Sequence, residues 1–173
     1  NFKLHHIESI VKKASETVKA KNKTFSVYVF GWVAWDKRLR IGQKMGRLDP
    51  HVDYIYPMIY PSHFYPNSLN FKNPADHPDE IIERGYLAAI KRVKHAQIIP
   101  MLQVFWYQPE MILEQIKSVY MNDMPGYICW NAIGRYPLLE RAFDTLDKNI
   151  ELEIKEKNRT IIIESNLDKR ISI

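Results

Sequence analysis

Four runs of β-branched and aromatic residues alternate with helix-forming segments, and this alternation constrains the fold more than any other feature. The runs cover residues 26–32, 52–64, 98–106 and 127–130. Apolar residues at helical spacing mark the segments around them, at residues 7–18, 78–93, 108–120 and 137–146. Strands that alternate with helices pair in parallel through right-handed crossovers. The runs lack in-out alternation, so we expect both faces of the sheet to be covered.

The composition favours sugars over nucleic acids or membranes as partners. The chain of 173 residues has a formal net charge of +5, but its lysines are scattered among Asp and Glu, as on solvated helix faces. No apolar run approaches the roughly 20 residues of a membrane-spanning helix. Four Trp and ten Tyr are more informative, because aromatic rings suit stacking on sugar rings. We expect a carbohydrate partner, no nucleic acid and no membrane span.

Polar and aromatic side chains gather where the predicted strands end. In parallel α/β proteins, ligands sit at the carboxyl ends of the strands. We therefore expect six residues from these ends to contact a substrate, namely Trp32, Tyr60, Ser62, Gln103, Trp130 and Asn131. An equally good interpretation makes Tyr60 and Trp130 aromatic residues of the core.

Several motifs in this chain resemble those of a known family. The run from Asp53 to Phe64 (DYIYPMIYPSHF) is similar to the signature of a bacterial family of glycoside hydrolase-like TIM barrels, a domain-of-unknown-function family. Residues 30–31 and 41–43, 73–78, 100–103 and 126–132 match further motifs of this family in order. The resemblance covers about residues 5 to 146. It implies a partial (β/α)8 TIM barrel, with this chain as the C-terminal half.

The resemblance also implies what a half-barrel would lack. Members of the family carry an earlier strand that ends in a carboxylate-bearing motif, and no such motif occurs here. Cutting a closed sheet leaves two open edges, so we expect this chain alone either to be poorly soluble or to pair with an N-terminal half-barrel.

We expect the half-barrel to cover residues 1–149 and to be followed by a separate extension at residues 150–173. In the extension, Ile150, Leu152 and Ile154 alternate with charged residues. This pattern favours a short β hairpin.

Catalytic groups are scarce in the sequence. Glycosidic hydrolysis usually needs two carboxylates, and Asp36, after the first strand, is the one acid that we expect at the carboxyl ends of the strands. Asp36 is otherwise a loop or helix-capping residue. We expect Asp53, at the opposite end of its strand, to be structural. His63 is the second catalytic candidate, because it could orient an acid or bond a sugar hydroxyl; otherwise it packs in a loop.

No metal or other cofactor is predicted, because the histidines never pair with a nearby carboxylate at ligand spacing. Cys129 lies in an apolar run, where we expect a buried and unreactive thiol.

Three functions fit the sequence. The first is a glycoside hydrolase-like domain that acts on a bacterial polysaccharide. This chain would supply the strand ends that bind the substrate, and it would be inactive alone. The second is a non-catalytic carbohydrate-binding barrel, and the third is a structural or partner-binding domain. For the first two, the cell envelope or secretion is favoured over the cytoplasm.

Overall fold

The computed structural model describes residues 2–35 and 41–156, with the side chains of residues 147–156 excepted. A parallel sheet of short strands forms its centre, with the order β1-β2-β4-β5 and with β3 also paired to β2. The strands are β1 (Ser26–Phe30), β2 (Tyr54–Met58), β3 (Gln97–Ile98), β4 (Met101–Gln103) and β5 (Ile128–Trp130). The α/β prediction is confirmed, and the arrangement is consistent with part of a TIM-barrel-like fold.

The third predicted strand is split in two. Pro100 lies between β3 and β4 and has no N–H group to donate to a neighbouring strand. Its carbonyl oxygen still accepts a hydrogen bond from the Ile128 N–H group at 3.0 Å. The split therefore leaves four strand positions across the sheet, as the sequence indicates.

Five α-helices accompany the strands within the described residues. They are α1 (Phe2–Lys19), α2 (Met45–Leu48), α3 (Pro78–Ile90), α4 (Pro109–Met121) and α5 (Pro137–Glu156). A proline stands first in each of α3, α4 and α5, where its fixed φ suits the helix and its missing N–H group costs nothing. Short 3-10 turns follow β1 at Gly31–Ala34 and β2 at Pro61–His63.

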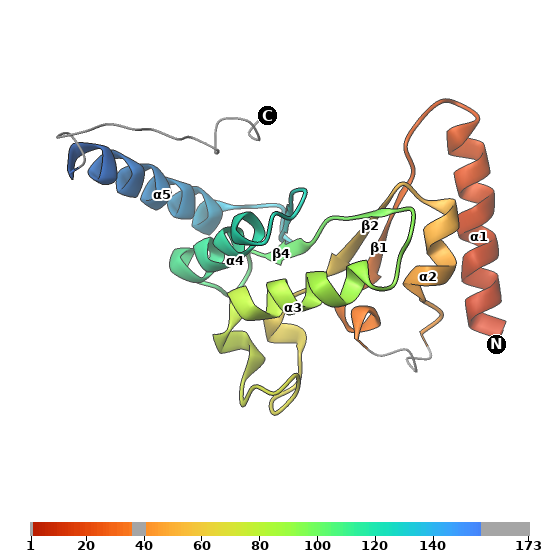
Figure 1. Ribbon diagram of the computed structural model, residues 1–173, viewed down its shortest axis with the longest axis horizontal. Coiled ribbons are helices and arrows are strands. Elements are labelled where there is room, and N and C mark those ends of the chain that lie inside the picture. Colours follow the sequence, from red (N-terminus) through yellow and green to blue (C-terminus); the bar gives the residue numbers. More distant parts are fainter. Residues whose placement is uncertain (1, 36–40, 157–173) are drawn as a thin grey trace.

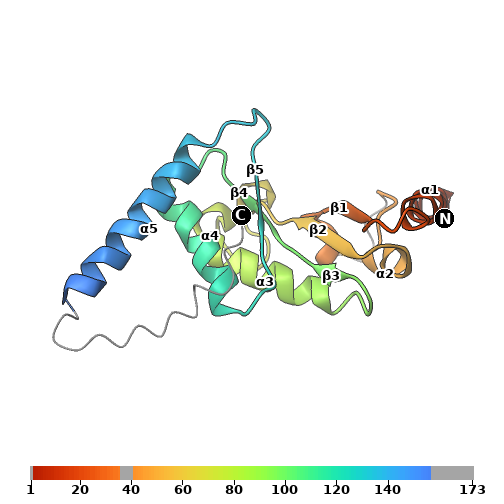
Figure 2. The same ribbon diagram turned by 90° about the horizontal axis from the view of Figure 1, so that it is seen from above.

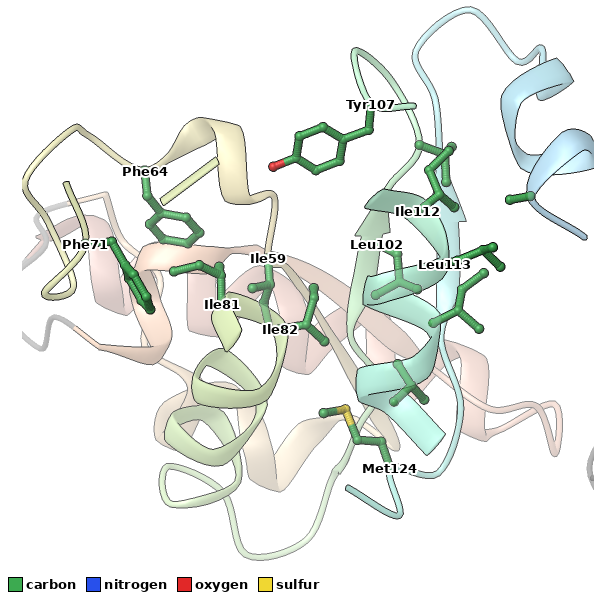
Figure 3. Packing of buried hydrophobic residues seen from close by; sticks show 14 residues of the cluster. Ile59, Phe64, Phe71, Ile81, Ile82, Leu102, Tyr107, Ile112, Leu113 and Met124 are labelled. Atoms are coloured by element: carbon green, nitrogen blue, oxygen red, sulfur yellow. The ribbon is translucent and has the colours of Figure 1, made fainter. Parts of the chain in front are cut away.

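The main core lies between the sheet and the helices α3 and α4. These helices pack side by side on one face of the sheet, and α5 packs against α4 (Figures 1 and 2). Ile59, Ile82, Leu102 and Ile112 meet between them and are completely buried (Figure 3). Burying a side chain of this size contributes about 1.5–3 kcal/mol, so this contact fixes the position of β4 against α4.

The described helices leave the opposite face of the sheet uncovered near β1 (Figure 2), where Tyr28 and Phe30 are exposed. Strand register places Phe30, Met58, Met101 and Ile128 in one row across it. Phe30 and the nearby Tyr28 are each 55% exposed. The expectation that both faces are covered is therefore wrong within the described residues. The sequence is misleading because aromatic residues alternate with aliphatic ones, so that both faces are apolar.

The expected β hairpin is wrong for residues 150–156, which continue α5. Ile150 and Ile154 alternate with charged residues, but they also lie four residues apart and extend the helical spacing from Leu146. Glu, Lys and Leu, which are common in this segment, favour helix. The helix therefore crosses the predicted boundary between residues 149 and 150, while residues 157–173 lie outside the described part.

Two carboxylates stabilise the edge of the sheet where the strands begin. Asp49 is 4% exposed, and its oxygens accept hydrogen bonds from the backbone N–H groups of Lys94, His95 and Ala96 at 2.7–3.0 Å. Asp53 accepts one from the Phe25 N–H group at 2.7 Å and pairs with Lys19 at 3.1 Å. The structural role expected for Asp53 is confirmed.

Replacing Asp49 should destabilise the fold in a pH-dependent way. Burial tends to raise the pKa of Asp49, but the three N–H donors outweigh it and hold the pKa below its ordinary value. The carboxylate therefore stabilises the fold above the ordinary Asp pKa of about 4, and this contribution is lost as the pH falls through the folded-state value. We expect Asp49→Asn to lower the free energy of unfolding by about 3 kcal/mol at pH 7. The difference from the parent should shrink below about pH 4.

Urea denaturation between pH 3 and 7 measures this difference. Glu114→Gln is the matched control, because Glu114 is an exposed carboxylate and its loss should cost less than about 0.5 kcal/mol. A cost for Asp49→Asn no larger than that of the control would contradict the structural role of Asp49.

Candidate functional site

A buried pair of glutamines organises the ends of β2 and β4. Gln103 and Gln115 are both completely buried. The Gln115 side chain accepts a hydrogen bond from the Gln103 N–H group and donates one to the Gln103 carbonyl oxygen, each at 2.9 Å. These two bonds tie the end of β4 to α4, because they satisfy both backbone groups of Gln103.

The Gln103 side chain then holds the two segments that follow the strands. Its Oε1 accepts a hydrogen bond from the Ser62 N–H group at 3.1 Å, and its Nε2 donates one to the Phe105 carbonyl oxygen at 2.9 Å. The expected direct contact of Gln103 with a ligand is therefore replaced by a positioning role, since its amide is buried and already paired. Ser62 Oγ is buried and has no partner among the described residues.

Tyr60 supports a cluster of rings above this network. Its ring lies 5.3 Å from the rings of His63 and Phe105 and stacks at 5.7 Å on Trp130. Tyr60 is only 3% exposed and its hydroxyl group contacts Met101 Sδ at 3.9 Å. Burial raises the pKa of Tyr60 far above its ordinary value, so the phenol stays protonated. Tyr60 thus packs beneath Trp130 and His63 and has little exposed surface of its own.

A hollow of about 380 Å³ lies beside this cluster, at the carboxyl ends of β4 and β5. We call it the β4–β5 groove; it is lined by His63, residues 104–106, residues 130–133, and residues 135, 137 and 138. Trp106 and Ile133 are 79% and 78% exposed among these residues. The groove is thus mainly apolar, with a few polar groups, as ligand sites commonly are.

The loop after β5 is fixed by Asn131. Its Nδ2 donates a hydrogen bond to the Arg135 carbonyl oxygen at 2.8 Å, and its Oδ1 accepts one from the Ile133 N–H group at 3.1 Å. Gly134 takes a φ of 65° in this turn, a conformation that costs glycine little. Asn131 lines the groove and also sets the direction of the chain toward Arg135.

The charge of the groove is positive. Arg135 is its only lining residue with a permanent charge, and no lining residue within the described part is Asp or Glu. Partial burial lowers the pKa of His63 below its ordinary value, so its imidazole is neutral at pH 7. A neutral imidazole can both donate and accept a hydrogen bond.

The structure brings six of the eight predicted site residues together at the ends of β2, β4 and β5. Tyr60, His63, Trp130 and Asn131 lie in or directly under the β4–β5 groove, and Ser62 and Gln103 lie beneath it. Trp32 packs elsewhere, against Phe64 at 4.9 Å and Tyr65 at 6.0 Å. Asp36 lies outside the described residues.

Eight residues that line the groove were not among the predicted site residues, and Phe105, Trp106 and Arg135 are the aromatic and charged ones among them. The adjacent aromatic pair after β4 was a usable signal, because it follows a strand end directly. The backbone of Trp106, with a φ of 63°, could not be inferred, because Trp has no preference for that conformation.

A long ordered loop, residues 64–77, flanks the site. The Phe71 ring lies between the His77 ring at 4.5 Å and the Arg84 guanidinium at 4.4 Å. Tyr107 donates a hydrogen bond to the Ala75 carbonyl oxygen at 2.7 Å, which ties the loop to the segment after β4 (Figure 3). These contacts attach the loop to α3 and to the segment after β4.

Metal and thiol chemistry find little support here. Within residues 2–35 and 41–156, no three His, Cys, Asp or Glu side chains form a group that could hold a metal ion. Burial raises the pKa of the Cys129 thiol to about 12, in keeping with an unreactive thiol. No helix in this part of the chain is long and apolar enough to cross a membrane.

Comparison with known proteins gives one match. A family described as "putative glycosyl hydrolase domain" matches residues 1–136, which include the sheet and the β4–β5 groove up to Arg135. No curated protein and no solved structure matches the chain.

The positioning role of Gln103 leads to a prediction. Gln103→Leu removes the acceptor of the Ser62 N–H group and the donor to the Phe105 carbonyl oxygen. We expect the free energy of unfolding to fall by about 2 kcal/mol, with a red shift of tryptophan emission as Trp130 loses its support. Denaturation followed by fluorescence measures both effects.

Gln97→Leu is the matched control, because Gln97 is exposed and the same atoms are changed. Equal stability and equal emission for the two variants would contradict the network.

Proposed function

The chain belongs to the family of glycosyl hydrolase domains that matches residues 1–136, and from this premise we propose that it binds a polysaccharide in the β4–β5 groove. In this proposal the chain supplies the strand ends that hold the sugar in a glycoside hydrolase-like barrel. The polysaccharide is one of bacterial origin, from a cell wall or an exopolysaccharide.

The observation that carries the proposal is the lining of the groove. Aromatic surface from Trp106 and Trp130 lies beside the polar groups of His63 and Asn131. Sugar rings have apolar faces that stack on aromatic rings and hydroxyl groups at their edges that need hydrogen-bond partners. A groove of about 380 Å³ falls within the range that accepts a small ligand or a short part of a polymer.

The same lining argues for binding without hydrolysis by this part of the chain. A glycosidase normally places two carboxyl groups about 5–9.5 Å apart across the scissile bond. No carboxylate lines the groove among the described residues. Asp36 remains the candidate for one acid, and the other would come from outside the described residues. His63 would then hold a sugar hydroxyl or orient the acid.

The uncovered face of the sheet supports the proposal that a second half-barrel binds this chain. Tyr28 and Phe30 are each 55% exposed there, beside the apolar row that includes Met58 and Met101. A half-barrel that supplies further parallel strands would cover this face and satisfy the edges at β1 and β5. The alternative is a non-catalytic carbohydrate-binding barrel, and it is supported by the absence of Asp and Glu from the groove among the described residues.

Hydrolysis and binding without hydrolysis are told apart by the release of reducing ends. We expect the chain to be retarded in native gels that contain the bound polysaccharide, because the groove binds the sugar. We expect the chain to release no reducing ends from that polysaccharide. Trp130→Ala should abolish the retardation. Trp32→Ala, which removes an indole outside the groove, should leave it unchanged.

Hydrolysis by a form of the protein that includes further barrel strands would favour the enzyme over the binding module, provided that Asp36→Asn removes it. Loss of retardation in Trp32→Ala but not in Trp130→Ala would overturn the position of the site.

A further inference from the structure

We propose that the β4–β5 groove selects an acidic polysaccharide, with Arg135 pairing with a carboxylate on one sugar and Trp106 stacking on a neighbouring ring. This inference rests on the proposed function and adds to it the chemical class of the sugar. It also adds two residues, Arg135 and Trp106, to those expected from the sequence.

The charge of the groove is the first argument. Arg135 is exposed, and the structure describes no ion pair between it and an acidic residue in the part of the chain that it covers. It faces the groove without a competing carboxylate, because no Asp or Glu lines the groove within that part. A neutral sugar needs no cation, whereas a carboxylate matches the planar fork of the guanidinium group with two parallel hydrogen bonds.

The position of Arg135 is set in advance. Its carbonyl oxygen accepts the Asn131 side-chain hydrogen bond at 2.8 Å, and Asn131 also holds Ile133. The loop that carries the guanidinium is therefore tied to the end of β5. A tied loop loses less entropy when it binds a ligand, so the backbone that carries the Arg135 side chain is fixed at the rim of the groove.

Trp106 is the second argument. Its φ of 63° is a conformation that side chains larger than glycine rarely adopt, yet its ring is 79% exposed and gains little from burial. The ring contacts Phe105 edge-on at 5.1 Å and lies 6.2 Å from His63. A strained residue that presents an indole to solvent beside a groove is typical of a ligand contact.

Matched oligosaccharides test the charge. The hexamers of galacturonate and mannuronate, each as the free acid and as the methyl ester, keep the same backbone while the ester removes the charge. We expect calorimetric titration to give at least about tenfold tighter binding of one acid than of its ester, a difference of about 1.4 kcal/mol. This preference should weaken as salt is raised.

Two arginine variants locate the preference. Arg135→Gln should bind the acid and the ester equally. Arg141→Gln makes the same change of charge on α5, at an exposed residue that does not line the groove, and should keep the preference of the parent.

Trp106→Gly separates binding from folding. Glycine accepts a positive φ freely, so we expect the melting temperature to stay the same or to rise, while the affinity for both forms of the sugar falls on the order of tenfold. Phe2→Ala is the control, because Phe2 is a similarly exposed aromatic residue, 75% exposed, at the start of α1.

The outcomes are distinct. Equal binding of acid and ester by the parent overturns the acidic preference and leaves the proposed function standing. A preference that survives in Arg135→Gln assigns the charge recognition elsewhere and overturns the role of Arg135. Binding of neither form of either hexamer overturns this inference, while retardation in gels that contain polysaccharide decides the proposed function separately.

Discussion

The buried amide pair of Gln103 and Gln115 is the interaction on which the site depends. Gln115 satisfies both backbone groups of Gln103 from α4, and Gln103 in turn holds the backbone at Ser62 and Phe105. A buried polar network is stable only when all its members are paired, and here the pairing joins one helix, one strand and two loops. Those two loops carry His63 and Trp106, so the groove is attached to the core through Gln103.

The beginnings and the ends of the strands carry different kinds of side chain. Where the strands begin, Asp49 and Asp53 accept backbone hydrogen bonds and stabilise the fold. Where they end, the described side chains at the groove are aromatic, aliphatic, amide and basic, and none is a carboxylate. This division follows the rule for parallel barrels, in which chemistry is placed at the carboxyl ends of the strands. The β4–β5 groove lies at this end of the strands, within residues 1–136 that the family model matches.

Much of the fold follows from local sequence patterns, but less of the site does. The alternation of apolar runs and amphipathic segments gave the order of strands and helices, and the polar tips gave Tyr60, His63, Trp130 and Asn131. Pattern alone could not show that Gln103 turns its amide into the core, because that depends on Gln115 twelve residues later. The sequence pattern also could not separate strand from helix after Ile150, because Ile150 and Ile154 fit both the two-residue spacing of a strand and the four-residue spacing of a helix.

Solution NMR of the four indole groups tests directly whether a sugar binds in the β4–β5 groove. Trp106 and Trp130 line the groove, whereas Trp32 and Trp35 pack together with Phe64 outside it. When the chain is labelled with ¹⁵N at tryptophan and titrated with a uronate hexamer, we expect the Trp106 and Trp130 indole signals to shift and those of Trp32 and Trp35 to stay in place. Shifts confined to Trp32 and Trp35, or no shift of any indole signal, would contradict it.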